Sequence, residues 1–140
     1  MHVTTIDLRR RAEWLGYLGL LPLAAATLLF ALGPGSNEPV LLAIQGYGAV
    51  ILAFVGAIHW GRALNTGDGR LMTLSVVPSL LGWSCLLMPP ALGLPLLAAA
   101  FALVLLFDRR EYRAVPWFRQ LRLRLTFMIC GLLLLSWALL

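Results

Sequence analysis

Long apolar stretches alternate with short polar segments along the whole chain. A membrane-spanning helix needs about 20 mainly apolar residues, and five stretches meet this requirement. The glycines, prolines and charged residues between them tend to end a membrane-spanning helix. We therefore predict an all-α integral membrane bundle of five transmembrane helices in a single transmembrane domain, residues 1–140, with helices at about 13–32, 40–63, 71–88, 91–107 and 116–140.

The third stretch, 71–88, contains Pro78. Proline lacks a backbone N–H and crowds the preceding turn, so this helix should kink. We expect the hydroxyl of Ser75 or Ser79 to bond the carbonyl group that the proline frees.

The second stretch, 40–63, carries small residues at a spacing of four. Small residues in a row let a second helix backbone approach closely in lipid, which predicts a packing face. This row consists of Ala49, Ala53, Ala57 and Gly61. Gln45, Gly56 and His59 lie on another face of the same helix. That face could leave room for a ligand, or it could admit bulky side chains from a neighbouring helix.

Composition and charge strengthen the membrane assignment and add an orientation. The chain is 61% hydrophobic and 12% charged, with mean hydropathy +0.88, which excludes a soluble fold. All 11 basic residues are arginines. Placing the N-terminus in the cytoplasm and the C-terminus in the periplasm puts every arginine on the inner side. We predict a multi-pass protein of the cell inner membrane, and no nucleic-acid partner.

His59 is the only ionisable side chain well inside a predicted span. Such a group needs a partner or a wet cavity to offset its desolvation. Because His59 precedes Arg62 by less than one turn, we expect it near the cytoplasmic interface and half solvated. Three roles stay open: a structural hydrogen bond, contact with a ligand or proton, and ligation of haem or a metal. We expect no cofactor and no metal, with haem or quinone as the alternatives.

Six arginines and interleaved aromatic residues fill the segment 108–124. Such segments attract anionic lipid, and the arginine fork can grip phosphate or carboxylate groups. Asp108 is placed to pair with Arg122, Arg124 or His59. The candidate ligand or partner residues outside the row of small residues are therefore Gln45, Gly56, His59, Trp60, Asp108, Trp117, Arg119, Arg122 and Arg124.

Two motifs resemble one known family. Residues 48–61 contain F-x-G-x-x-H-W-G, ending at His59-Trp60-Gly61, and residues 117–126 contain an aromatic pair followed by L-R-x-x-L-T. They resemble signatures of a small membrane-protein family of unknown function that includes mitochondrial transmembrane protein 69. The resemblance implies a membrane setting and no particular activity, and it draws attention to His59, Trp60 and the segment 119–124.

These features favour a non-enzymatic protein. We find no pair of carboxylates within a span, no nucleophile constellation and no phosphate loop. The favoured function is an accessory or assembly subunit that binds a larger membrane complex, such as a respiratory complex. The alternative is a binder or carrier of a hydrophobic ligand such as quinone, porphyrin or lipid, through the His59 face. The expected partners are anionic lipid at the cytoplasmic face and another membrane protein or a second copy of the chain.

Overall fold

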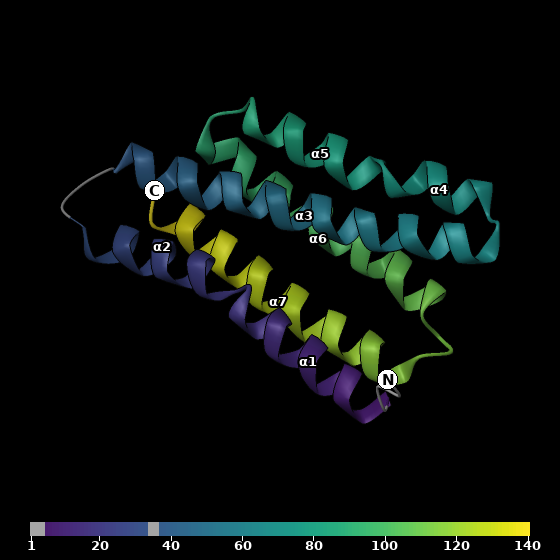
Figure 1. Ribbon diagram of the computed structural model, residues 1–140. Coiled ribbons are helices and arrows are strands. Elements are labelled where there is room, and N and C mark those ends of the chain that lie inside the picture. Colours follow the sequence, from purple (N-terminus) through teal and green to yellow (C-terminus); the bar gives the residue numbers. More distant parts are fainter. Residues whose placement is uncertain (1–4, 34–36) are drawn as a thin grey trace.

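The computed structural model describes residues 5–33 and 37–140. Within these residues the chain is helical, with no strand, as the apolar pattern predicts (Figure 1). The helices are α1 (Thr5–Leu18), α2 (Leu21–Leu32), α3 (Glu38–Thr66), α4 (Gly69–Ser75), α5 (Val77–Leu86), α6 (Pro90–Glu111) and α7 (Pro116–Ala138).

The helices make successive passes along one bundle. Helices α1 and α2 form the first pass and α4 and α5 the third, so α1 begins and α7 ends at opposite ends of the bundle (Figure 1). The long helix α3 packs against α2, α4, α5, α6 and α7. The helix predicted at 40–63 is therefore the centre of the fold.

The first pass differs from the single helix predicted at 13–32. It begins earlier, at Thr5, and it breaks between Leu18 and Leu21. Pro22 has no N–H to continue the backbone ladder, which explains why α2 restarts there. The hydroxyl of Tyr47 donates a hydrogen bond of 2.8 Å to the carbonyl oxygen of Gly19, so α3 satisfies a backbone group at the break.

The third pass is interrupted where the sequence predicts a kink. Helix α4 ends at Ser75 and α5 begins at Val77, just before Pro78. The hydroxyl of Ser75 donates to the carbonyl of Met72 at 2.6 Å. Among the described residues, neither this hydroxyl nor that of Ser79 bonds the carbonyl of Leu74, which Pro78 frees, so that detail of the prediction is wrong.

Helices α3 and α6 are longer than the apolar pattern predicts, because polar residues continue both of them. Helix α6 runs to Glu111 and not to residue 107, so Asp108 lies on the helix and not in a loop. Helix α3 runs to Thr66 and ends at Gly67, whose φ of +69° is the left-handed conformation that glycine adopts easily. The side chain of Asp68 then caps α4 by accepting from the backbone N–H groups of Arg70 and Leu71.

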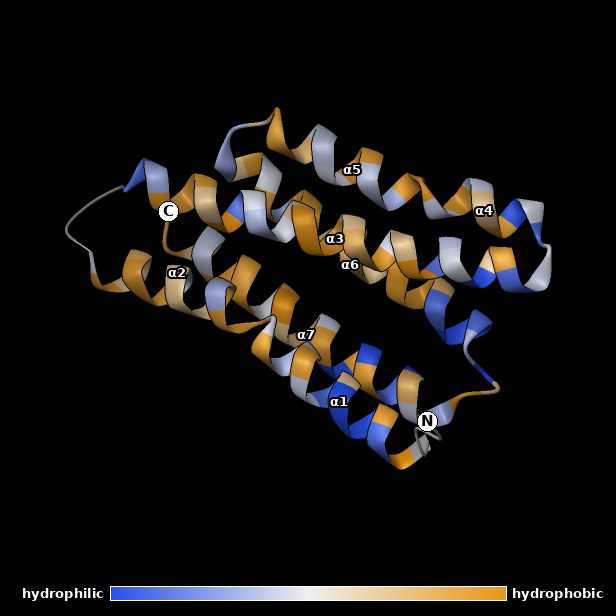
Figure 2. Ribbon diagram, in the orientation of Figure 1, coloured by the Kyte–Doolittle hydropathy of each residue, from blue (hydrophilic) through white to orange (hydrophobic). Residues whose placement is uncertain are grey.

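Four helical stretches among the described residues are long and apolar enough to cross a membrane: Ile6–Leu32, Glu38–Thr66, Pro90–Glu111 and Pro116–Ala138. The all-α membrane bundle is thus confirmed, with four candidate spans where the sequence predicted five. The break at Val76 leaves 7 residues in α4 and 10 in α5, so neither piece qualifies alone. Hydrophilic residues gather at the end of the bundle where α1 and α7 begin and α3 and α6 end (Figure 2).

Close helix contacts around α3 involve a different set of small residues from the predicted row. Ala49 faces Gly82 of α5, where an added Cβ would lie 3.1 Å from the Ala49 carbonyl oxygen. A Cβ at Gly56 would lie 2.5 Å from the backbone oxygen of Ser75. In contrast, Ala57 and Gly61 are exposed. The row therefore packs inside the bundle only at its Ala49 end, because α4 and α5 approach α3 on the Gly56 side.

A buried glycine and an exposed glycine of α3, Gly56 and Gly61, give a matched test of this packing. Gly56→Ala should lower the apparent melting temperature in detergent, because the Ser75 backbone must shift, and overpacking of this kind costs about 1–3 kcal/mol. Gly61→Ala makes the same change in helix propensity, but an added Cβ there meets nothing within 4 Å. It should leave the melting temperature unchanged or raise it. Equal melting temperatures for the two variants would contradict the structure.

Candidate functional site

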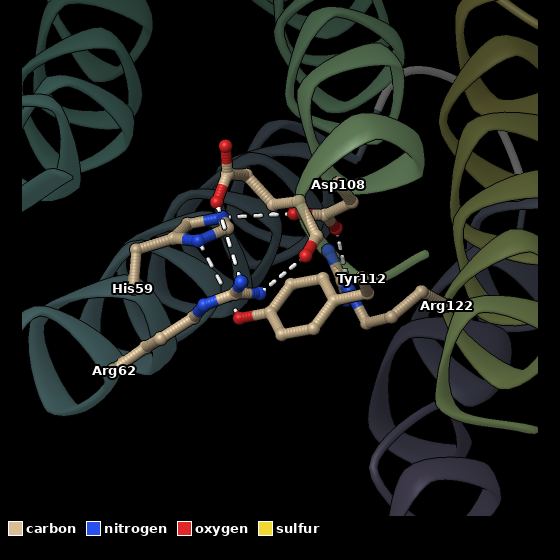
Figure 3. Close-up of polar contacts among 6 residues, drawn as sticks. His59, Arg62, Asp108, Tyr112 and Arg122 are labelled. Carbon is tan, nitrogen blue, oxygen red and sulfur yellow. Dashed lines mark hydrogen bonds and ion pairs between the residues drawn. The ribbon is translucent and has the colours of Figure 1, made fainter. Parts of the chain in front are cut away.

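A buried carboxylate joins three helices near the hydrophilic end of the bundle. Asp108 of α6 is 1% exposed, and its Oδ2 accepts a hydrogen bond of 2.8 Å from Nε of Arg122 on α7. Its other oxygen, Oδ1, lies 2.8 Å from Nε2 of His59 on α3. Figure 3 shows Asp108 between the two side chains. The predicted pairing of Asp108 is confirmed for His59 and Arg122, while Arg124 is exposed.

The contact between His59 and Asp108 is close but imperfectly aligned. The two atoms lie 2.8 Å apart, yet neither has a hydrogen-bond partner in good geometry. The Arg122 guanidinium, in contrast, makes a directed hydrogen bond to the carboxylate. A buried carboxylate is tolerated only when a partner offsets its desolvation, and Arg122 is the residue that does so here.

His59 lies deeper in the protein than the sequence predicted. We expected it to be half solvated, whereas it is 2% exposed. Phe107 meets its ring edge-on at a centroid distance of 5.2 Å, and Tyr112 stacks on it at 5.7 Å. Tyr112 can cover His59 because α6 continues about one turn beyond the predicted end at residue 107.

Tyr112 completes the site, and the sequence analysis missed it. Its hydroxyl lies 3.5 Å from Nδ1 of His59, a long hydrogen bond. Burial, followed by the negative charge of Asp108, raises the pKa of Tyr112, so its hydroxyl stays protonated and able to donate. The spacing of four between Asp108 and Tyr112 was the available signal, because residues i and i+4 share a helix face.

Arg62 closes the same cluster from the surface. Its Nη1 donates to the backbone carbonyl of Glu111 at 2.5 Å, and its Nη2 lies 3.6 Å from the Glu111 carboxylate. The guanidinium lies 4.9 Å from the centre of the Tyr112 ring. Arg62 thus caps the last turn of α6, where a cation is favoured by the helix dipole.

Neighbouring side chains and backbone fill the second face of α3. Nε2 of Gln45 donates to the backbone carbonyls of Cys85, at 2.5 Å, and Met88, at 3.0 Å. Gly48 meets Leu97 and Leu133, and Gly56 meets Pro78 and the backbone of Ser75. Of the two interpretations of this face, the structure matches neighbour packing.

The remaining predicted residues lie outside the buried cluster. Trp60 is 46% exposed and borders a shallow hollow with Ala53 and Ala57. Trp117 is half-buried and packs edge-on against Phe118 at a centroid distance of 5.7 Å. Arg119 lines a separate hollow with three other arginines. The predicted site residues therefore form two sets: a buried group around Asp108 and several surface positions.

The buried arrangement is suited to holding helices together. His59, Asp108, Tyr112 and Arg122 contact one another and are almost closed to the exterior. The described residues contain no group of three or more His, Cys, Asp or Glu side chains able to hold a metal ion. Because Asp108 reaches α3 and α7 at once, the cluster fixes three helices at the level where the arginine-rich segment begins.

Comparison with known proteins identifies the family. The family model described as "Protein of unknown function (DUF3429)" matches residues 8–138. The chain belongs to this family. Transmembrane protein 69 of Xenopus tropicalis is 33% identical over 128 residues, which cover 86% of this chain and 51% of the relative. The chain thus spans about half the length of this curated relative, and no solved structure matches. The family resemblance predicted from the two motifs is confirmed.

Removal of the Asp108 charge should destabilise the bundle strongly. Asp108→Asn leaves Arg122 buried without its counter-charge, a change that costs about 3–5 kcal/mol in proteins. The measurement is the free energy of unfolding in mixed micelles. Glu111→Gln is the matched control, because its partner Arg62 is one-third exposed and such pairs contribute about 0–1 kcal/mol. A loss no larger than that of the control would show that the buried pair does not hold the helices.

Proposed function

We propose that this protein is a non-enzymatic accessory or assembly subunit that binds a larger complex in the cell inner membrane, such as a respiratory complex. In this proposal the chain crosses the membrane five times, with α4 and α5 as the third pass. The end of the bundle that carries the arginines faces the cytoplasm, and the C-terminus lies on the opposite side. The asymmetric distribution of arginine supports this orientation.

The observation that carries the proposal is the outward-facing part of the small-residue row on α3. Ala57 and Gly61 are exposed, and an added Cβ at Gly61 would meet nothing within 4 Å. Beside them is a hollow of about 160 Å³. Ala53, Ala57 and Trp60 border it on one side, and residues around the α4–α5 break border it on the other. In lipid, small residues at this spacing favour close approach of another helix.

We assign this surface to a transmembrane helix of a different protein. A second copy packed through the same row in a parallel arrangement would bring Arg62 and Arg70 towards the same residues of its partner, and like charges oppose such an interface. The closed cluster around Asp108 supports a non-enzymatic role, because its acid, histidine and tyrosine contact one another and not an open cavity.

A second candidate function is binding of a hydrophobic ligand, but at a different place from the His59 face. A groove of about 250 Å³ lies between α1, α3 and α7, and its lining includes Val50, Phe54 and Arg122. Nη2 of Arg122 is buried without a hydrogen-bond partner. An apolar molecule with an acceptor oxygen, such as a quinone or a lipid, would suit an apolar groove that has the Arg122 side chain in its lining.

The accessory function is tested by position-dependent crosslinking in the native membrane. A photoreactive amino acid at Ala57 should capture one protein in stoichiometric yield, whereas the same probe at exposed Leu103 of α6 should not. Ala57→Leu, with the probe moved to Ala53, should abolish the capture while leaving the melting temperature unchanged, because its side chain fills the hollow. Capture of the chain by itself, or equal capture from both positions, would overturn the assignment to another protein.

The ligand-binding function is tested by the small molecules that co-purify with the protein in mild detergent. Val50→Trp should reduce the amount of one enriched apolar molecule at least about tenfold, because the indole would occupy the groove. Leu103→Trp is the control, since Leu103 is also exposed and lies away from the groove. Mass spectrometry and the absorption spectrum measure the retained molecule. No enrichment over the bulk membrane in the unmodified protein would contradict this second candidate.

A further inference from the structure

Four arginines converge on one hollow at the hydrophilic end of the bundle. The hollow has a volume of about 310 Å³, and its lining consists of Leu106, Arg109, Arg110, Arg113 and Arg119. Among the residues that the structure describes, no acidic one lines it. Among the ion pairs of the described residues, none includes any of these four arginines.

The fold brings these arginines together from three segments. Arg109 and Arg110 lie in the last turn of α6, Arg113 lies in the connection, and Arg119 lies in the first turns of α7. Tyr112 lies between Arg110 and Arg113 in the chain and is buried. Its ring packs on that of Phe118 at a centroid distance of 4.8 Å. This contact anchors the connection against α7, so the turn holds its arginines outward while Tyr112 points into the His59 cluster.

The nearby acids are already engaged elsewhere. Asp108 is buried against Arg122 and His59. Glu111 contacts Arg62 and lines a different hollow, with Asp68 and Arg70. The four guanidinium groups therefore repel one another without an internal counter-charge, and an anion in the hollow would relieve that repulsion. Arginine suits phosphate in particular, because its planar fork can donate two parallel hydrogen bonds to phosphate oxygens.

The hollow also has an apolar side. Leu106 is 57% exposed and lies on α6, which is one of the candidate membrane spans. Arg109 follows it by three residues, so the hollow lies where α6 changes from apolar to basic residues. Phosphate groups of membrane lipids occupy this level, and basic pockets beside transmembrane helices recognise them.

We propose that this hollow is a specific binding site for the phosphate headgroup of an anionic phospholipid, with Arg109, Arg110, Arg113 and Arg119 as its ligands. The acyl chains of the lipid lie along the Leu106 side of α6. The site is separate from the surface of α3 that the proposed function uses, so either can fail without the other.

The test is native mass spectrometry of the detergent-purified protein with added lipid. Phosphatidylglycerol should bind with a stoichiometry of one per chain and should be retained far better than phosphatidylcholine. Arg110→Gln combined with Arg113→Gln should weaken phosphatidylglycerol binding by at least about tenfold. The matched control is Arg10→Gln combined with Arg11→Gln, which removes the same charge from exposed arginines of α1 and should leave binding unchanged.

Two further comparisons define the site. Arg110→Lys combined with Arg113→Lys keeps the charge and the fold but removes the forks, so binding should weaken less than in the glutamine variant. Inorganic phosphate at the same concentration should neither bind nor displace the lipid. Equal weakening in the α1 control would show unspecific attraction to surface charge, and binding of inorganic phosphate as tight as that of the lipid would show a soluble-anion site. Either result would overturn the proposal.

Discussion

The fold depends on one buried charge, the carboxylate of Asp108. Removing a carboxylate from water is costly, and only a well-placed cation and hydrogen bonds offset that cost. Arg122 supplies both in this protein. Because the two residues lie on α6 and α7, and His59 approaches from α3, the need to satisfy one charge fixes the relative depth of three helices. Apolar contacts alone would specify that depth poorly in lipid.

This constraint shapes the surface as well as the interior. The turn after α6 must present Tyr112 to His59, and it therefore presents the neighbouring arginines outward. Arg62 then closes the cluster by capping the end of α6. The interior polar groups serve cohesion, and the surface carries the features open to partners: a row of small residues on α3 and an arginine-lined hollow. The function that we propose, binding to another membrane protein, uses this division of roles.

Close packing of α3 against α5 depends on glycine in a way that the spacing of small residues did not reveal. Gly56 and Gly82 allow backbones to approach within van der Waals contact, and Gln45 donates to the carbonyl of Met88 in the turn before α6. Of the row at four-residue spacing, only Ala49 takes part in these contacts. Helices α4 and α5 approach α3 there, and Ala57 and Gly61 of the row stay exposed.

The sequence by itself determined the membrane class, the family, the approximate helices and three possible partners for Asp108, because apolar length, short motifs and helical spacing are local properties. It placed the ends of α3 and α6 too early, since hydropathy marks where a helix leaves the apolar layer and not where its hydrogen bonds stop. Only the tertiary structure decided that His59 is buried, that Tyr112 joins it and which face of α3 packs. Those outcomes depend on contacts between residues about 50 positions apart, such as His59 and Tyr112, and such contacts leave no periodic pattern in the chain.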